Sequence, residues 1–471
     1  MKYEFAVGLE VHIELLTKTK TFCGCATEFG GMPNSHCCPI CMGFPGALPV
    51  LNSRVVDYAI MAGLATNCKI NHLSNMVRKN YVYPDLPKAY QISQNDRPIC
   101  SGGYIKLSSE KSIRINRIQI EEDAGKMIHS DNLTLIDYNR CGVPLLEIVT
   151  EPDMRSIEEV KEFIERLQLI IKYIGISDCK MQEGSMRCDV NISTMLEGES
   201  SLGTRTEIKN MNSIAFILKA IRYEFERQKE LLIDGQSIKR ETLRYVEKEN
   251  ITKTMRQKEA ESDYRFFREP DLNPIMVTEK KINGIQISMP ELPDVKLKRF
   301  VEVYSLDNNS AQSLVKYKKV AEFFEDSIEN VSSPRIASNL ILCVIFKILG
   351  TEREKEDFDI SVSNNDFNKL VLLVDKGRIS TNKAKSILEQ MIRYGKTVSD
   401  IVSVEDISSL SEEDTVNYCR DAISLMPKAA QDYVNGKTKA LKPLIGAVMS
   451  RTNGKADAKL VQAILVNMLN K

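Results

Sequence analysis

The chain has 471 residues, and its 64 lysines and arginines balance its 64 aspartates and glutamates. This neutral total excludes attraction of nucleic acid by the charge of the whole chain, although a local basic patch is compatible with it. The length exceeds one hydrophobic core and predicts roughly two to four domains. No apolar run approaches the roughly 18 residues of a membrane span, and the first residues show no secretory signal, so we expect a cytoplasmic protein without a membrane anchor.

The first predicted element is a β-strand over residues 7–15, in which apolar residues at odd positions alternate with mostly polar ones at even positions. Because side chains of a strand alternate between two faces, one face is expected in the core and the other carries Glu10, His12 and Glu14. Carboxylates and an imidazole on one face are costly to bury unless they meet water, a cation or a substrate. We therefore interpret this face as functional.

A loop rich in glycine, proline and asparagine follows, and it contains two short cysteine motifs. Cys23-Gly-Cys25 and Cys38-Pro-Ile-Cys41 offer four thiols on two knuckles, which suits tetrahedral zinc. The first knuckle has fewer intervening residues than usual, and His36 and Cys37 are nearby competitors for a ligand position. Because disulfides are uncommon in the cytoplasm, the alternative is a group of reduced thiols. We expect a structural zinc site.

Two further strands and a helix are predicted in the first half of the chain. Residues 113–123 and 186–193 alternate apolar and polar side chains, and residues 156–174 place apolar side chains at helical spacing. Alternation of this kind is typical of antiparallel sheets with one packed face. We therefore expect residues 1 to about 290 to form an α+β domain.

Carboxylates from these segments form a second candidate site. Glu147 lies inside the apolar run 143–149, where a carboxylate without a partner is costly. Because Mg²⁺ prefers oxygen ligands and is compatible with one imidazole such as His12, the acids predict a magnesium site. The alternative is ordinary ion pairing with nearby arginines. The acids are Glu10, Glu14, Glu121, Glu122, Asp123, Glu147, Glu151 and Asp153.

Nucleotide-binding glycine motifs are missing from the sequence, which has neither a P-loop nor a G-x-G-x-x-G turn opening a helix. Any nucleotide would therefore be bound by a polar sheet face with a metal ion and basic side chains. The candidates to meet phosphate are Arg78, Lys79, Lys126, Arg187, Arg205 and Lys209.

Residues 287–294 form a proline-punctuated boundary, beyond which the pattern is helical. A helix is predicted over 369–376, ending at Gly377, and the polar segment 361–366 is expected to cap or link. From about residue 403 a small helical module is expected, with a helix-start signal at 411–414.

Basic residues accumulate near the end of the chain, where only Asp457 opposes them from residue 437 onward. Such a run is either a solvated face or a patch that binds the phosphate backbone of nucleic acid. The basic residues are Lys437, Lys439, Lys442, Arg451, Lys455, Lys459 and Lys471.

Several long motifs occur in the same order as in a known family. The motifs are Glu10-Val-His12, Arg78 to Gln94, Glu121-Glu-Asp-Ala-Gly-Lys126, Asn139-Arg140, Pro144 to Asp153, Glu183 to Ile192 and Lys209-Asn-Met-Asn-Ser213. On these motifs the sequence resembles the B subunits of the bacterial tRNA-dependent amidotransferases (GatB) across nearly the whole chain. One departure is Arg268, which stands where the family usually has proline.

The resemblance implies a fold and a domain organisation. Residues 1–293 would form a catalytic cradle related to the glutamine synthetase fold, an antiparallel sheet with helices, carrying the zinc knuckles as an insertion. Residues 294–402 would form an all-α domain, and 403–471 a small YqeY-like tail that binds tRNA.

The resemblance also implies an activity. The family uses ATP to phosphorylate the side-chain carboxylate of mischarged Glu-tRNA(Gln), Asp-tRNA(Asn) or both, and ammonia then replaces the phosphate. The ammonia comes from a glutaminase A subunit, and a small C subunit completes a heterotrimer. The expected enzyme is therefore a carbon–nitrogen ligase with glutamine as amido donor.

Site residues follow from the motif match. Mg²⁺ is expected on His12, Glu121 and Glu147 with Glu10 and Glu122 as neighbours, and the choice between Glu121 and Glu122 stays open because neighbouring strand positions face opposite sides. Zinc is expected on Cys23, Cys25, Cys38 and Cys41. The expected tRNA-binding residues are Lys437, Lys439, Lys442, Arg451 and Lys455. The expected catalytic residues are Glu10, His12, Lys79, Lys126, Arg187, Asp189 and Lys209.

Two other functions are alternatives to this one. The first is a non-catalytic, zinc-containing tRNA-binding protein, which the clustered acids disfavour because they repel phosphate unless a cation intervenes. The second is a free-standing amidoligase acting on a small metabolite, which leaves the helical tail without a role.

Overall fold

A computed structural model describes residues 2–131, 133–257, 264–402, 412–452, 456 and 458–470. The chain separates into two compact units, residues 1–292 and 293–471, and this boundary lies inside the predicted proline-punctuated segment. Within the described ranges, no helix is both long and apolar enough to cross a membrane. The finer division into three domains stays a prediction.

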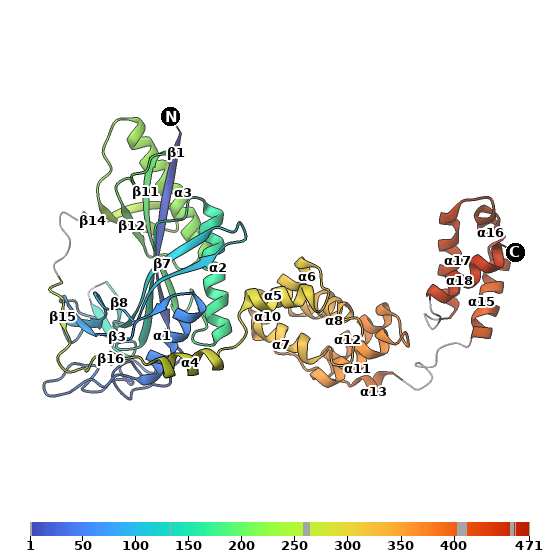
Figure 1. Cartoon of the computed structure of the whole chain (residues 1–471), viewed down its shortest axis with the longest axis horizontal. Helices are drawn as coiled ribbons and strands as arrows, with labels where there is room; N and C mark the ends of the chain where they lie inside the picture. The colour runs from blue at the N-terminus through green and yellow to red at the C-terminus, as the bar shows by residue number, and fades with distance from the viewer. Residues whose placement is uncertain are drawn as a thin grey trace. The chain divides into compact units, whose positions relative to one another are not determined.

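The first unit is built on a nine-stranded sheet with β1 near its centre (Figure 1). From one edge to the other, the strands are β14 (Ile251–Gln257), β13 (Glu241–Val246), β12 (Thr206–Lys209), β11 (Met186–Leu196), β1 (Tyr3–Glu14), β10 (Pro144–Thr150), β7 (Ser112–Glu122), β6 (Cys100–Lys106) and β2 (Lys69–Ile70).

Neighbouring strands of this sheet run antiparallel, with one exception. Strands β12 and β13 are parallel because α3 (Ile214–Ile233) joins them as a crossover, which returns the chain in its original direction. The predicted α+β class is confirmed, but the sheet is mixed rather than purely antiparallel.

Helices cover one face of the sheet, where α2 and α3 pack on the strands together with α1 (Figure 1). α1 spans Ser53–Ala65, and α2 spans Ile157–Ile174, close to the predicted helix. The Ser156 hydroxyl caps the start of α2, and Gly175 ends it in the left-handed conformation at φ 72°. Fully buried Phe163, with the apolar residues of β1, belongs to this core. The apolar side chains of each strand point to the face that the helices cover, so the alternate, polar side chains point to the opposite face.

Short strands and one helix complete the first unit. They form two-stranded and three-stranded sheets that present side chains beside the polar face. The elements are β3 (Leu73–Ser74), β4 (Val77–Asn80), β5 (Tyr90–Ser93), β8 (Lys126–His129), β9 (Thr134–Asp137), β15 (Phe267–Arg268), β16 (Ile275–Met276) and α4 (Glu279–Ser288).

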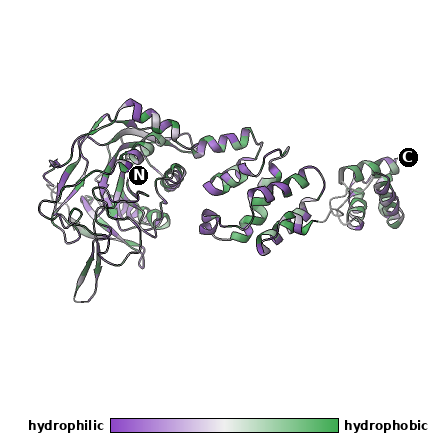
Figure 2. Cartoon of the chain, turned by 90° about the horizontal axis from the view of Figure 1, so that it is seen from below, coloured by the Kyte–Doolittle hydropathy of each residue, from purple (hydrophilic) through white to green (hydrophobic). Residues whose placement is uncertain are grey.

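The second unit is helical, as predicted, and its helices carry both apolar and polar residues (Figure 2). The predicted helix at 369–376 is longer than expected because Ser363, in the predicted polar segment, caps its start. The apolar run near residue 340 contains a π-helical turn, Ile341–Ile345. The helices up to residue 402 are α5 (Pro293–Glu302), α6 (Asn308–Val315), α7 (Lys318–Asp326), α8 (Arg335–Leu340), α9 (Phe346–Leu349), α10 (Glu352–Asp357), α11 (Asn364–Asp375), α12 (Thr381–Tyr394) and α13 (Val398–Ile401).

The last helices form a small core of their own. Leu444, Val448, Val461 and Leu465 are fully buried in it, and its members all come from residues beyond 417. The predicted cap at Ser411 lies outside the described residues. The elements are α15 (Glu412–Leu425), α16 (Pro427–Val434), the 3₁₀ turn η2 (Thr438–Ala440), α17 (Leu441–Arg451) and α18 (Ala458–Leu469).

An ion-pair group joins α5 to α7 and gives a first prediction. Glu325 pairs with Lys296 and with Arg299 at 2.5 Å, and Tyr304 donates to it at 3.1 Å. Burial raises the pKa of Glu325, but the hydrogen bonds from Arg299 and Lys296 outweigh it and hold the pKa below its usual value. A carboxyl with a lowered folded pKa stabilises the fold above its unfolded pKa, and this stability is lost as the pH falls through the folded pKa.

Glu325→Gln is therefore expected to speed hydrogen exchange in α5 and α7 at pH 7. The difference from the unsubstituted protein should shrink as the pH falls from the unfolded pKa of about 4.3 through the lower folded pKa, because Glu325 is then protonated in both states. Comparing both proteins at each pH cancels the intrinsic exchange rate. Equal exchange of both proteins at pH 7 would contradict a stabilising role for this group.

Candidate active site and metal sites

His12 lies on the uncovered face of the sheet, within reach of three carboxylates. Its Nε2 atom is 3.6 Å from Glu121, 3.9 Å from Glu147 and 4.0 Å from Glu10. Strand register brings them together, because His12 on β1 stands opposite Glu147 on β10, which in turn stands opposite Gln119 on β7. Three strands therefore place one imidazole and three acids at one point.

Neutral donors orient the buried acids of this group. The Gln119 amide donates to Glu147 at 2.9 Å and to Glu121 at 3.1 Å, and the Ser93 hydroxyl donates to Glu121 at 2.6 Å. The Gln91 amide also donates to Glu121, at 3.2 Å. These neutral groups fix the carboxylates without cancelling their charge.

The electrostatics of the group favour an added cation. Burial, together with the charges of Glu121 and Glu10, raises the pKa of Glu147 well above its usual value. Burial alone would also raise the pKa of Glu121, but the hydrogen bond and charge of His12 hold it low. The pKa of His12 is in turn raised, since Glu121 outweighs the effect of burial. A divalent cation would relieve the same repulsion that protonation relieves.

The ligand atoms fit such an ion. Oxygen atoms of Glu10 and Glu147 and a ring nitrogen of His12 all lie within 4.8 Å of one another. Oxygen donors with few protein ligands suit Mg²⁺, which keeps several waters for phosphate groups. Glu121 stands beside this set through its contact with His12.

Glu122 is not brought to this group. Its carboxylate accepts a hydrogen bond from the Ile92 amide at 2.8 Å and pairs with the buried Lys88. Neighbouring residues of a strand point to opposite faces, so Glu121 faces His12 while Glu122 faces away. The structure brings the first of these two candidates, and not the second, to the group around His12.

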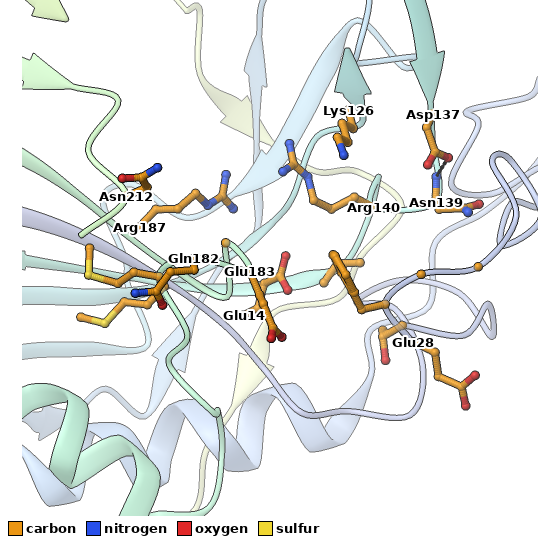
Figure 3. A pocket seen from close by; sticks show the side chains of 18 of the residues that line it. Glu14, Glu28, Lys126, Asp137, Asn139, Arg140, Gln182, Glu183, Arg187 and Asn212 are labelled. Carbon is orange, nitrogen blue, oxygen red and sulfur yellow. Dashed lines mark hydrogen bonds between the residues drawn. The ribbon is translucent and has the colours of Figure 1, made fainter. Parts of the chain in front are cut away.

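A cavity of about 720 Å³ is lined by basic and acidic side chains from several segments of the first unit (Figure 3). Figure 3 shows Lys126, Arg140 and Arg187 above Glu14 and Glu183. Asp123 holds both arginines, accepting a hydrogen bond from Arg187 at 2.6 Å and lying 3.3 Å from Arg140. Burial, with the charge of Asp123, raises the pKa of Glu14 to about 7. The cavity combines fixed positive groups with a proton-binding carboxyl.

A second cavity of about 480 Å³ includes His12 in its lining. It shares Arg187 and Asp189 with the first cavity. Asp189 pairs with Lys209, which also lies 2.9 Å from Glu207. Four of the predicted catalytic residues therefore line the same cavity, namely His12, Arg187, Asp189 and Lys209.

Lys79 approaches from β4, in the three-stranded sheet. Its ammonium group lies 5.0 Å from the ring of Tyr264 and 5.9 Å from the ring of Tyr81. Its charge also helps to lower the pKa of Glu121, after the larger effect of His12. Lys79 therefore belongs to the electrostatic surroundings of the acids.

The four predicted zinc cysteines lie together. The sulfur atoms of Cys23, Cys25, Cys38 and Cys41 are all within 4.8 Å of one another. The Cys38 amide donates to the Cys41 sulfur at 3.2 Å, and a hydrogen bond from Cys23 is the main cause that lowers the pKa of Cys41 to about 4. The nearby competitor Cys37 instead points at Asn139, with its sulfur 3.9 Å from the side-chain oxygen. Four converging sulfurs suit a tetrahedral zinc ion.

The predicted tRNA-binding residues of the tail are exposed where the structure describes them. Lys437 pairs with Asp432 at 2.9 Å, and Arg451 lies 3.6 Å from Asp421. Lys439 and Lys442 are exposed near the start of α17. Lys455 lies outside the described residues.

Sequence reasoning missed several residues of the site. Gln119 could have been found, since it shares the polar face of the predicted strand 113–123 with Glu121. Ser93 and Gln91 come from β5, whose four residues are too short to give a clear pattern. Arg244 lines the second cavity beside Lys209, its register partner on the parallel strand, and the parallel pairing was not foreseen.

Comparisons with known proteins identify the family of the chain. Residues 5–283 match the family model described as the GatB/GatE catalytic domain, and residues 322–469 match the one described as the GatB domain. Curated relatives, named as the B subunits of aspartyl/glutamyl-tRNA(Asn/Gln) amidotransferases, are 49% identical in Caldicellulosiruptor saccharolyticus, 47% in Thermoanaerobacter sp. (strain X514) and 44% in Clostridium kluyveri. Each alignment covers 100% of this chain and 100% of the relative. The chain therefore belongs to the GatB family, the B subunits of the aspartyl/glutamyl-tRNA amidotransferases.

Proposed function

We propose that this chain amidates mischarged Glu-tRNA(Gln), Asp-tRNA(Asn) or both, as the ATP-using subunit of a glutamine-dependent carbon–nitrogen ligase. The observation that carries the proposal is the group of Glu10, His12 and Glu147, in which His12 lines a cavity together with Arg187 and Lys209. The names of the full-length relatives supply the substrate. The proposal places the protein in the cytoplasm.

The chemistry requires activation of a carboxylate. A carboxylate is a poor electrophile, because its leaving group would be oxide, and ATP provides a better one by forming an acyl phosphate. Phosphoryl transfer depends on positioning and charge stabilisation more than on covalent chemistry by the protein. A polar sheet face with cations meets these needs without a glycine-rich loop.

The residues divide this work. Glu10, His12 and Glu147 would hold Mg²⁺, with Glu121 beside them, and the ion would neutralise charge on the transferred phosphate. Arg187 and Lys209 are held by Asp123 and Asp189, so their positive groups are fixed before substrate arrives. Lys126 lines the wider cavity and would bind phosphate or the incoming carboxylate. The positive charge of Lys79 would help to keep Glu121 ionised.

Partners and the remaining parts follow from the same proposal. A separate A subunit would hydrolyse glutamine to release ammonia, and a small C subunit would complete a heterotrimer. The four cysteines would hold a structural zinc ion outside the chemistry. The cradle would be related to the glutamine synthetase fold, and the tail beyond residue 403 would bind tRNA.

The test is transfer of the γ-phosphate of ATP to the side-chain carboxylate of Glu-tRNA(Gln) and Asp-tRNA(Asn). The chain is purified with its A and C subunits and supplied with labelled ATP, with and without Mg²⁺. We expect label on the aminoacyl group only with Mg²⁺, and loss of the label when ammonia is added. Tight tRNA binding without transfer would instead support a non-catalytic tRNA-binding subunit, and amidation of free amino acids would support a metabolite amidoligase.

A further inference from the structure

Lys20 is a fully buried lysine beside the four cysteines, with 0% of its surface exposed. Its ammonium group donates to the carbonyl of His36 at 2.7 Å and to that of Tyr138 at 3.4 Å. It also lies 3.8 Å from the sulfur of Cys41. Among the residues that the structure describes, no carboxylate forms an ion pair with it.

A buried ammonium group needs a compensating negative charge. Transfer of an isolated charge from water into a protein interior is costly, and carbonyl dipoles compensate only part of it. The buried Lys88 shows the usual solution, since it pairs with the carboxylate of Glu122. Lys20 has the sulfur of Cys41 in the place where Lys88 has a carboxylate.

The net charge of the four cysteines depends on whether they are neutral thiols or thiolates bound to a metal ion. Four neutral thiols would leave the ammonium of Lys20 without a counter-charge. Four thiolates on a divalent metal ion carry a net charge of about −2, and one adjacent ammonium halves it. The position of Lys20 therefore fits a cysteine group that carries negative charge, as metal-bound thiolates do, and not a group of four neutral thiols.

Lys20 also connects both knuckles to the body of the first unit. Its backbone amide donates to the carbonyl of Cys25 at 3.0 Å, and its side chain reaches the carbonyl of His36, just before the second knuckle. The carbonyl of Tyr138 belongs to the segment that follows β9. The next residue, Asn139, accepts from the His36 amide at 2.8 Å and lines the 720 Å³ cavity.

We propose that Lys20 is the counter-ion of a metal-bound thiolate group and couples metal binding to the wall of the large cavity. This inference rests on the proposed zinc site and assigns a role to a residue outside the ligand set. Loss of the charge would weaken zinc binding, and loss of zinc would loosen the segment around Tyr138 and Asn139.

The experiment measures zinc affinity of the full chain with its partner subunits, by competition with a chromophoric chelator. Lys20→Met removes charge and donors, and Lys20→Gln keeps an amide donor without the charge. Lys18→Met is the matched control, since Lys18 lies two residues away and is exposed. We expect zinc affinity to fall roughly 10–100-fold in both Lys20 variants and to stay unchanged in the control, as for other outer partners of metal ligands.

A second measurement reports on the order of the segment that lines the 720 Å³ cavity. Hydrogen exchange of the segment around Tyr138 and Asn139 should slow when zinc is added to the metal-free protein, and this protection should be smaller in Lys20→Gln. If both neutral variants fail to fold with zinc in excess while Lys20→Arg folds and binds zinc, the positive charge is required and the inference holds.

Two results would overturn the inference, and they are distinguishable. An unsubstituted chain that holds no zinc by metal analysis would remove the metal site on which the inference rests, while leaving the amidation proposal intact. Normal zinc affinity in Lys20→Gln would keep the metal site and reject Lys20 as its counter-ion.

Discussion

Glu147→Gln is expected to lower the rate of γ-phosphate transfer from ATP at least about 100-fold, a loss of ~3 kcal/mol of transition-state stabilisation. Glu147 is one of the three residues whose ligand atoms lie close together, and its side chain is 7% exposed. Glutamine keeps the size and the oxygen that Gln119 contacts, so the variant removes chiefly a negative charge. The measurement is label transfer to the aminoacyl group over a range of Mg²⁺ concentrations.

The same substitution should stabilise the protein in the absence of Mg²⁺. Burial and neighbouring acids raise the pKa of Glu147, so its ionised form costs stability at any pH above its unfolded pKa. Removal of the charge should therefore raise the thermal midpoint in metal-free buffer while activity falls. A carboxylate that lowers the stability of the fold in this way is expected to serve the activity of the protein and not its structure.

Glu151→Gln serves as the control for this prediction. Glu151 follows the same strand and accepts a hydrogen bond from Asn116 at 2.7 Å, without belonging to the group around His12. Its substitution should leave transfer and Mg²⁺ dependence unchanged. If Glu147→Gln transfers the γ-phosphate at the full rate, the acids around His12 are ordinary ion-pairing residues and not a site for Mg²⁺.

The elements with strong local signals were the ones predicted well from sequence. The alternation around His12 predicted a strand, and Ser156 and Gly175 bracket a helix close to its expected limits. The parallel pairing of β12 with β13 was not foreseen, because it depends on where the crossover helix α3 packs. The π-helical turn at Ile341–Ile345 had no signal beyond an apolar run.

The candidate site was predictable in its residue types but not in its geometry. Sequence alone could not choose between Glu121 and Glu122, because a shift of one position exchanges the faces of a strand. Gln91 and Ser93 support Glu121 from a separate small sheet, a contact between segments distant in the chain. Lys20 carries no distinguishing signal in the sequence, and only the packed structure shows that it is fully buried.

Deletion of residues 403–471 is expected to weaken binding of mischarged tRNA at least about tenfold and to leave the first unit folded. The apolar core of the tail is made of its own residues, and the core of the first unit contains none of them. The truncated chain should therefore keep the thermal transition of the cradle and its γ-phosphate transfer at saturating tRNA. The measurement is tRNA affinity at several salt concentrations, made with the partner subunits present.

Salt dependence separates direct phosphate contacts from an indirect effect of truncation. Each phosphate contact contributes about 0.7–0.9 to the slope of log affinity against log salt, so the truncated chain should show a shallower slope. Unchanged affinity after truncation would contradict a tRNA-binding tail.

Point variants locate the contacts within the tail. Lys437 and Arg451 already pair with Asp432 and Asp421, whereas Lys439 and Lys442 are the stronger candidates because no described acid is seen to neutralise them. Lys439→Glu with Lys442→Glu should therefore reproduce much of the loss in affinity and slope. Each of the two substitutions made singly should lower affinity, whereas Lys376→Glu, the same single substitution at an exposed position after α11, should not. If all three substitutions lower affinity equally, the effect comes from net charge, and the patch on the tail is a solvated face.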